Sequence, residues 1–292
     1  MFKHVPVLLK ETIELLNLRP GDQVIDGTVG LGGHAKVILE KISPNGHLLA
    51  LDRDPRQVIA AQNNLAAFGN QVKIINDSYA NLAHHAYDQR ITPVAAVLLD
   101  LGYSSVHVDN PERGFSFQTE GPLDMRYDPT GELTAAEIVN TWSEEDLARI
   151  FLVYGEENNA KKIARAIIQT RVQKKLETTT ELAQAIETVV PRRGKVHPAT
   201  KVFQALRIVT NDELGELERA LPQIIEILKP GGRLAIISFH SLEDRIVKTF
   251  FRKQDNKTLK IINKHVIVPT EEEIEENPRS RSAKLRVAEK LV

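Results

Sequence analysis

The chain has 292 residues, 42% of them hydrophobic and 26% charged, with a formal net charge of -1 and no cysteine. This composition is typical of a folded globular protein, and the small net charge means that only a local basic surface could attract nucleic acid. The lack of cysteine excludes disulfides, thiolate nucleophiles and iron–sulfur chemistry. Because the sequence has no targeting signal and no long apolar run, we expect a cytoplasmic protein without a membrane-spanning segment.

From the N-terminus, the segment from His4 leads into a short helix that is predicted to end near Leu16. Residues 23–25 suit a buried strand, residues 26–34 follow as Asp-Gly-Thr-Val-Gly-Leu-Gly-Gly-His, and residues 35–40 suit a helix. Glycines in such a turn can adopt positive φ and admit a ligand to the backbone, and the helix N-terminus offers unpaired N–H groups. The glycines concerned are Gly27, Gly30, Gly32 and Gly33. The stretch therefore predicts a binding site for a nucleotide-like ligand.

A carboxylate follows the next predicted strand, where residues 46–51 lead into Asp52. In a Rossmann-type unit, the acid at the end of the second strand binds ribose hydroxyls. The alternative is an ordinary glycine-rich turn, in which Asp52 caps the helix that begins near Pro55. Dinucleotide enzymes carry the pattern G-x-G-x-x-G, whereas this turn starts with an acid that would repel a pyrophosphate and attract a cationic ligand. We therefore favour S-adenosylmethionine over NAD as the ligand.

A helix and a third strand are predicted within residues 55–75, before Tyr79. Tyr79 could flank an adenine ring, and a partly buried loop tyrosine is an equal alternative. A fourth apolar strand then delivers Asp100 to its tip. Because open α/β sheets bind ligands at the carboxyl ends of their strands, we expect Asp26, Asp52 and Asp100 to converge on one crevice. The alternation of strands and helices predicts an α/β fold with a largely parallel sheet.

After Asp100 the sequence becomes rich in loops as far as Arg126. Loops of this length inside a compact domain are usually functional or disordered. Arg113, Phe115 and Phe117 place a cation beside two rings, which could clamp and stack an exposed base. A small hydrophobic staple beneath the loop is an equal alternative.

Residues 134–207 have helical periodicity, and we interpret 109–210 as a helical insert between two parts of the sheet domain, 1–108 and 211–292. The second half of the insert, 161–207, holds eleven Lys or Arg residues against three Glu, an excess of eight positive charges. A basic face of this size suggests contacts with RNA phosphates, and a solvated helix face is the alternative.

The sheet is predicted to resume after an amphipathic helix at 212–228, which Pro222 could bend or divide, and a turn at 229–232. A buried strand at 233–238 then leads to His240, which stands at a strand tip on the crevice side. A satisfied loop histidine is the more common fate of such a residue.

The C-terminal part supplies one more helix and one more strand. Ser241 is the predicted N-cap of the helix, with Asp244 as the acid of a capping box. The acidic run at 271–276 is predicted to be a solvated loop, and the alternating residues 285–289 to form the last, edge strand.

Several of these motifs occur together in one known family. Residues 112–117 are Glu-Arg-Gly-Phe-Ser-Phe, residues 121–126 are Gly-Pro-Leu-Asp-Met-Arg, and further matching blocks lie at 26–34, 98–105 and 238–248. On these residues the chain resembles, over essentially its whole length, the RsmH (MraW) family of S-adenosylmethionine-dependent methyltransferases of small-subunit ribosomal RNA.

The resemblance implies a class I (Rossmann-like) methyltransferase fold with a helical insert that binds the RNA. It implies methylation of the exocyclic N4 of a cytidine in the decoding region of 16S ribosomal RNA. The expected contacts with S-adenosylmethionine are Gly30, Gly32, Gly33, His34, Asp52, Tyr79, Asp100 and His107, the last standing where the family usually has glutamine. The expected substrate contacts are Arg113, Phe115, Phe117 and Asp124. The expected partner is small-subunit ribosomal RNA or the ribosomal subunit, with no metal and no obligate protein partner.

The missing cysteine agrees with this activity. Methylation at C5 of a pyrimidine normally needs covalent activation by a thiolate, whereas an exocyclic amine needs in-line geometry and a proton acceptor. Asp100 is the first candidate for that acceptor, and His240 is the second. Residues 100–103, Asp-Leu-Gly-Tyr, differ from the Asp-Pro-Pro-Tyr signature of DNA amino-methyltransferases, so the acceptor geometry cannot be borrowed from those enzymes.

Two other classes of protein stay open on the sequence alone. A dinucleotide oxidoreductase would bind NAD in preference to S-adenosylmethionine, which a titration separates. A non-catalytic RNA-binding or assembly factor would explain the basic insert but not the acids at the strand tips, and a methyl-transfer assay separates it.

Overall fold

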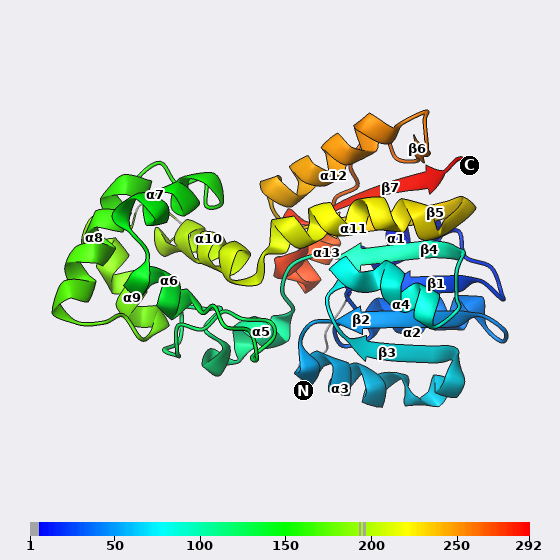
Figure 1. Ribbon diagram of the computed structural model, residues 1–292, viewed down its shortest axis with the longest axis horizontal. Coiled ribbons are helices and arrows are strands. Elements are labelled where there is room, and N and C mark those ends of the chain that lie inside the picture. Colours follow the sequence, from blue (N-terminus) through cyan, green and yellow to red (C-terminus); the bar gives the residue numbers. More distant parts are fainter. Residues whose placement is uncertain (1–5, 193, 195–196) are drawn as a thin grey trace. The chain divides into compact units, whose positions relative to one another are not determined.

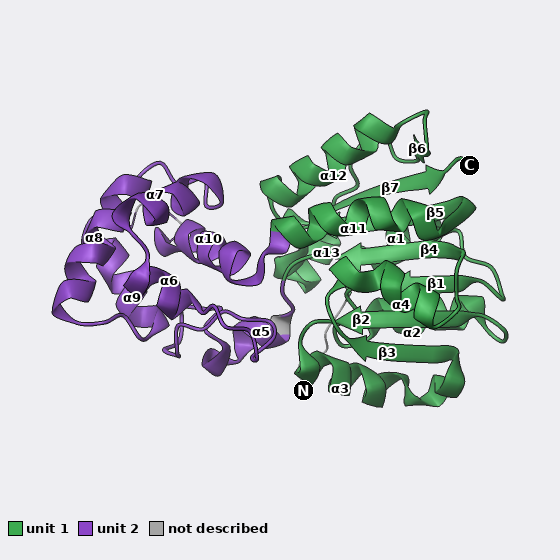
Figure 2. Ribbon diagram, viewed as in Figure 1, with its two compact units in different colours: residues 1–102, 214–292 green, residues 103–213 purple. Residues whose placement is uncertain are grey.

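The computed structural model describes residues 6–292 apart from 193, 195 and 196 (Figure 1). His4, with which the predicted N-terminal segment begins, lies outside the described residues. The chain forms two compact units, which are residues 1–102 with 214–292 (unit 1) and residues 103–213 (unit 2) (Figure 2). Among the described helices, none is long and apolar enough to cross a membrane.

Unit 1 is built on a seven-stranded sheet in the order β3-β2-β1-β4-β5-β7-β6. Strands β1 to β5 are parallel to one another, whereas β7 is antiparallel to both β5 and β6. The strands are β1 Gln23–Asp26, β2 His47–Asp52, β3 Val72–Asn76, β4 Val94–Asp100, β5 Leu228–Ser238, β6 Leu259–Ile261 and β7 Lys284–Lys290. The predicted α/β class with a largely parallel, Rossmann-like sheet is confirmed.

Alternate side chains of the strands enter two separate cores, because successive residues of a strand point to opposite faces of a sheet. Ile25 and Leu99 belong to the core that is covered by α4 (Leu82–Asp88), α11 (Glu213–Ile227) and α12 (Ser241–Gln254). Val24 and Leu98 belong to the core that is covered by α1 (Leu9–Leu16), α2 (Gly33–Ile42) and α3 (Pro55–Leu65). Asp26, Asp52 and Asp100 lie at even-numbered positions of their strands, as Val24 and Leu98 do. Their side chains therefore face the side of the sheet that α2 covers.

Unit 2 is helical and has a core of its own, which includes Phe151, Ile163 and Leu206. Its helices are α5 Ser105–Asp109, α6 Ala135–Thr141, α7 Glu144–Val153, α8 Ala160–Gln173, α9 Thr179–Glu187 and α10 Ala199–Asn211. Short 3₁₀ helices lie at η1 Ala66–Gln71, η2 Tyr79–Asn81, η3 Pro111–Arg113 and η4 Pro278–Ser282.

Unit 2 extends beyond the predicted insert, 109–210, at both of its ends. At the N-terminal end, the ring of His107 lies 4.9 Å from the ring of Phe115, centroid to centroid. At the C-terminal end, Asn211 Oδ1 accepts a 2.8 Å hydrogen bond from the backbone N–H of Tyr127. These contacts attach the flanking segments to the helical unit.

The acidic run at 271–276 is a helix, α13 (Glu271–Glu276), and the prediction of a loop is wrong. Thr270 caps it by accepting a hydrogen bond from the N–H of Glu273, and three glutamates in the first turn complement the positive end of the helix dipole. Glu273 also accepts a 2.7 Å bond from the N–H of Leu8. Local capping chemistry therefore outweighs the repulsion among the acids.

The C-terminal half of the sheet also differs in detail from the prediction. β7 is an inner strand, because the three-residue β6, which the sequence did not reveal, pairs with its outer side and forms the edge. The predicted turn at 229–232 lies within β5, where the pairing with β4 shifts register between Val94 and Ala96. Helix α11 is not divided at Pro222, and its buried residues, such as Leu221, pack on the sheet.

Candidate active site

Three aspartates meet at the carboxyl edge of the parallel strands. Asp26 ends β1 and lies in register with Ala50 of β2 and Leu98 of β4. Asp52 and Asp100 lie two residues further along those strands, so all three side chains point to the same face of the sheet. The convergence that the sequence predicts is present.

Asp52 holds the glycine loop through the backbone. Its Oδ2 accepts a 2.9 Å hydrogen bond from Gly30 N–H, and its Oδ1 accepts a 2.9 Å bond from Asp54 N–H. Gly30 and Gly32 have φ of 53° and 87°, in the left-handed region that favours glycine. Both oxygens of Asp52 are therefore oriented, and each keeps a second lone pair for a ligand.

Asp26 and Asp100 are connected through Thr28. The N–H of Thr28 donates to Asp26 Oδ1 at 3.1 Å, and the Thr28 hydroxyl oxygen accepts from the N–H of Asp100 at 2.6 Å. The loop that follows β1 is thus fastened to the tips of both neighbouring strands.

Burial raises the pKa values of all three acids. Loss of hydration raises the pKa of Asp26 to about 7, with a further rise from the charge of Asp52. Burial likewise raises the pKa of Asp52 to about 6, against the lowering effect of its hydrogen bonds from Asp54 and Gly30. The pKa of Asp100 lies well above its ordinary value, because of burial and the negative charges of Asp26 and Glu243. The cluster is short of positive charge.

The unsatisfied atom of this cluster is Asp100 Oδ1. It is buried and has no hydrogen-bond partner among the described residues, although the whole Asp100 side chain is 21% exposed. Asp100 Oδ2 lies 3.6 Å from Nδ1 of His34, while the other ring nitrogen of His34 is 3.1 Å from the carbonyl oxygen of Val7. A cationic ligand with hydrogen-bond donors would satisfy both the missing charge and the orphaned oxygen.

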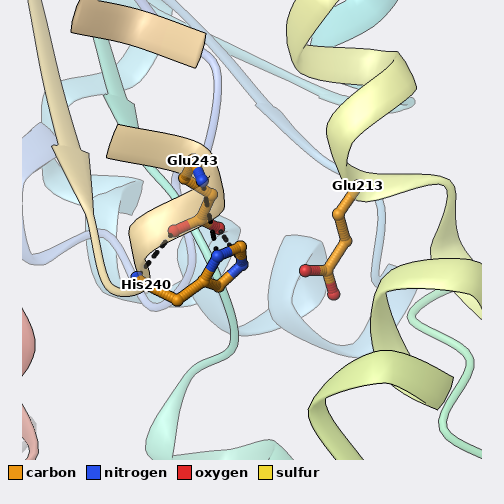
Figure 3. Close-up of side chains that lie close together, drawn as sticks. All are labelled: Glu213, His240 and Glu243. Atoms are coloured by element: carbon orange, nitrogen blue, oxygen red, sulfur yellow. Dashed lines mark hydrogen bonds and ion pairs between the residues drawn. The ribbon is translucent and has the colours of Figure 1, made fainter. Parts of the chain in front are cut away.

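His240 has a structural partner at the turn between β5 and α12 (Figure 3). It is the N-cap of α12, and its Nδ1 accepts from Glu243 N–H at 3.4 Å, while Glu243 accepts from the N–H groups of Phe239 and His240. The predicted cap, Ser241 with Asp244, is therefore wrong by one residue. Glu213, drawn in the same figure, belongs to unit 2 and is paired there with Arg207.

Tyr79 lies beside the start of the glycine loop. It opens the 3₁₀ helix η2 after β3 and packs against the core beneath α4 and α11. A Cβ placed on Gly27 would come within 2.9 Å of the Tyr79 Cβ, so the loop and the tyrosine are in contact. Tyr79 is thus in the same unit as the acid cluster, next to the expected ligand loop.

His107 belongs to unit 2 and has contacts within it. Its Nδ1 accepts a 3.1 Å bond from Ser104 N–H at the start of α5. Its ring is buried, with centroids 4.9 Å from Phe115 and 5.1 Å from Tyr127. A cofactor contact by His107 stays a prediction.

The loop residues proposed to clamp a base are held by one another. Arg113 is buried and donates to the carbonyl oxygens of Arg126 (2.9 Å) and Tyr127 (3.0 Å). Phe115 stacks on Tyr127, with centroids 5.4 Å apart, and also lies 6.1 Å from Tyr103. The packing of Phe115 is that of the hydrophobic staple, and its contact with a base stays a prediction.

Phe117 and Asp124 also have contacts within unit 2. Phe117 packs edge-on against Phe203 at 4.8 Å and beside His197 at 4.5 Å. Asp124 binds the guanidinium group of Arg126 at 2.6 and 2.8 Å, which holds the pKa of Asp124 below its ordinary value.

Three residues of these sites were not identified from the sequence. Thr28 links Asp26 and Asp100, and Glu243 adds negative charge near Asp100. Tyr103 is 45% exposed, and the guanidinium carbon of Arg207 lies 4.4 Å from the centroid of its ring. The spacing from His240 to Glu243 is that of a capping box, a signal that was missed because histidine is not a common N-cap.

The sheet, the glycine loop and the acid cluster together define the class of protein. A Rossmann-like fold with acids at three strand tips is that of an S-adenosylmethionine-dependent methyltransferase. A model of the MraW methylase family matches residues 1–291, and the chain belongs to that family.

Curated relatives agree with this assignment, and a solved structure shares the fold. The chain is 50% identical to the ribosomal RNA small subunit methyltransferase H of Elusimicrobium minutum, covering 99% of this chain and 98% of the relative. It is 51% identical to the protein of the same name from Nostoc sp. (strain PCC 7120), covering 99% and 93%. The crystal structure of a putative rRNA-methylase from Clostridium thermocellum is similar in fold alone, with a TM-score of 0.50, 14% identity, and coverage of 99% and 100%.

Proposed function

We propose that the chain transfers a methyl group from S-adenosylmethionine to the exocyclic N4 of a cytidine in the decoding region of 16S ribosomal RNA. The observation that carries this proposal is the buried, unsatisfied Oδ1 of Asp100 at the tip of β4, beside the glycine loop. The names of relatives about half identical to this chain supply the substrate class, small-subunit ribosomal RNA.

S-adenosylmethionine supplies an electrophilic methyl group, and unit 1 has residues that suit it. Asp52 is oriented by Gly30 and Asp54, and its free lone pairs suit the ribose hydroxyls. Tyr79 would flank the adenine ring, and the strand-tip acids would balance the positive charges of the ligand. The proposed contacts are Gly30, Gly32, Gly33, His34, Asp52, Tyr79 and Asp100 in unit 1, and His107 in unit 2.

Asp100 is the proposed proton acceptor. As N4 gains a methyl group it becomes acidic and must lose a proton, and a carboxylate within reach accepts it. The raised pKa makes Asp100 a stronger base than an ordinary aspartate, and its Oδ1 has no competing partner among the described residues. His240 is the second candidate, and its ring is restrained by Glu243.

Unit 2 is the proposed RNA-substrate domain. Arg113 and Asp124 would act by holding the shape of the loop, because each is bonded within it, and Phe115 and Phe117 would border the RNA. The proposed partner is small-subunit ribosomal RNA, free or within the subunit, and this substrate requires a cytoplasmic location.

The test is the chemical identity of the product. Purified protein and labelled S-adenosylmethionine are incubated with free 16S RNA and with small subunits that lack the modification. The RNA is then digested to nucleosides and analysed by mass spectrometry. We expect N4-methylcytidine at one site in the decoding region. Recovery of 5-methylcytidine or a 2′-O-methyl nucleotide instead would refute the proposed chemistry.

A further inference from the structure

Helix α12 carries a row of basic side chains on its outer face. Its inner face buries Leu242, Val247 and Phe251. Arg245, Lys248 and Arg252, spaced by three and four residues, are exposed, as expected for one face of an amphipathic helix. We call these three residues the α12 basic row.

The α12 basic row starts at the edge of the sheet that carries the acid cluster. Asp100 pairs with Ile237 of β5, and α12 begins three residues after the end of that strand. The charge of Glu243, in the first turn of α12, acts on Asp100. At about 1.5 Å of rise per residue, the row therefore begins within two turns of the reacting edge and runs about 10 Å along the helix.

Both acids in the first turn of α12 have partners outside the row, and the charge of Asp244 also acts on Lys248. Glu243 is buried in the cap. Asp244 is bound by Arg286 at 2.6 Å and faces Lys284 at 3.7 Å, both from β7. Lys248 and Arg252 have no ion-pair partner among the described residues.

The basic stretch of unit 2 is different, because much of its charge is used internally. Arg171 donates to the carbonyl oxygens of Val139 and Trp142, Lys174 pairs with Glu181, Arg165 with Glu144, and Arg207 with the buried Glu213. The excess of eight positive charges counted from the sequence therefore overstates what unit 2 can offer to phosphates.

We propose that the α12 basic row binds the phosphate backbone of the RNA strand next to the methylated nucleotide. This inference rests on the proposed function and adds a second RNA-binding surface to it, in unit 1. Three exposed cations in a row match a chain that carries one negative charge per nucleotide. The row lies on the opposite side of the sheet from the one that the acids face but starts at the same edge, so it suits RNA that passes over that edge from the acid cluster.

The test compares two double variants of equal charge change. Lys248→Gln with Arg252→Gln removes two charges from the row. Lys41→Gln with Lys73→Gln removes two exposed charges from elsewhere in unit 1 and is the matched control. Lys248→Arg with Arg252→Lys keeps both charges. Binding of a labelled fragment of 16S RNA is measured from about 50 to 300 mM salt, in a range where counterion release dominates affinity.

We expect the row variant to bind RNA about tenfold more weakly near physiological salt and to lower the slope of log affinity against log salt by about 1.4, since each single-strand phosphate contributes about 0.7. The control and the charge-conserving variant should bind as the wild type does. S-adenosylmethionine affinity and the rate at saturating RNA should not change, so the loss appears in KM for RNA.

An unchanged affinity and salt slope in the row variant would overturn the inference. So would a variant that binds naked RNA normally but fails only on assembled subunits, because the row would then contact a ribosomal protein. Failure of the proposed function is a separate result, since it appears in the wild type as a product other than N4-methylcytidine.

Discussion

The acid cluster has a cost in stability that can be measured through Asp26. This side chain is 1% exposed, and its pKa is raised from 3.8 to about 7, chiefly by burial. Ionised Asp26 is therefore about 4 kcal/mol less favourable in the folded chain than in the unfolded one, as an upper limit from about 1.4 kcal/mol for each pKa unit. Asp26→Asn removes this charge and keeps an oxygen that can accept from Thr28 N–H.

The direction of the pH dependence of stability is set by whether the folded or the unfolded chain binds the proton of Asp26 more tightly. The folded pKa is raised, so the stability that protonated Asp26 provides is fully present below pH 3.8 and is lost as the pH rises through about 7. Asp26→Asn should thus match the wild type only below about pH 3.8, and near pH 5 it should already be more stable, by up to about 1.6 kcal/mol. Near pH 8, without cofactor, it should be more stable, by up to about 4 kcal/mol.

Urea unfolding of the cofactor-free protein, followed between pH 5 and pH 8, measures this difference. The signal should come from unit 1, because two units need not unfold together. The Asn variant should also bind S-adenosylmethionine more weakly, because one of the acids that would balance the positive charges of the ligand is lost. Binding of the ligand would then explain why an acid that lowers stability is kept at this position. Identical pH dependence of stability in the two proteins would refute the electrostatic account of the cluster.

Two further predictions concern the ligands separately. Asp52→Ala should weaken S-adenosylmethionine binding by calorimetry roughly ten- to a hundredfold, because hydrogen bonds to a charged group contribute about 1.5–3 kcal/mol. Unchanged affinity in a folded variant would move the ribose site elsewhere. Reversing Lys161, Lys162 and Arg165 to Glu should lower RNA affinity and flatten its salt dependence while sparing cofactor binding. Since Arg165 already pairs with Glu144, the two lysines should account for most of the loss, and an unaltered salt slope would remove this helix from the RNA site.

The arrangement of the strand-tip acids could be predicted because it depends on topology. Parallel strands joined by helices end at one edge of a sheet, so an acid after each apolar run must meet its neighbours there. The alternation that sends Ile25 to one core and Val24 to the other also fixes the side of the sheet that the acids face.

The remaining features depend on contacts that no local pattern reveals. The stacking of Phe115 on Tyr127 and the two carbonyl partners of Arg113 were invisible in the loop sequence, so a base clamp and a staple were equal interpretations. The three residues of β6 are too few for a period to show. The number of basic residues in the sequence likewise overestimated the positive charge that unit 2 can offer to RNA, because the sequence does not show which cations form ion pairs within the unit.

The role of Asp100 is the central claim, and transfer by Asp100→Asn tests it most directly. Single-turnover methyl transfer is measured at saturating S-adenosylmethionine and RNA, with RNA binding measured in parallel. A general base contributes about a hundred- to ten-thousandfold, so the Asn variant should bind RNA as the wild type does, bind the cofactor somewhat more weakly, and lose at least about a hundredfold in rate at every pH. A variant that transfers the methyl group to N4 at the wild-type rate would contradict the account.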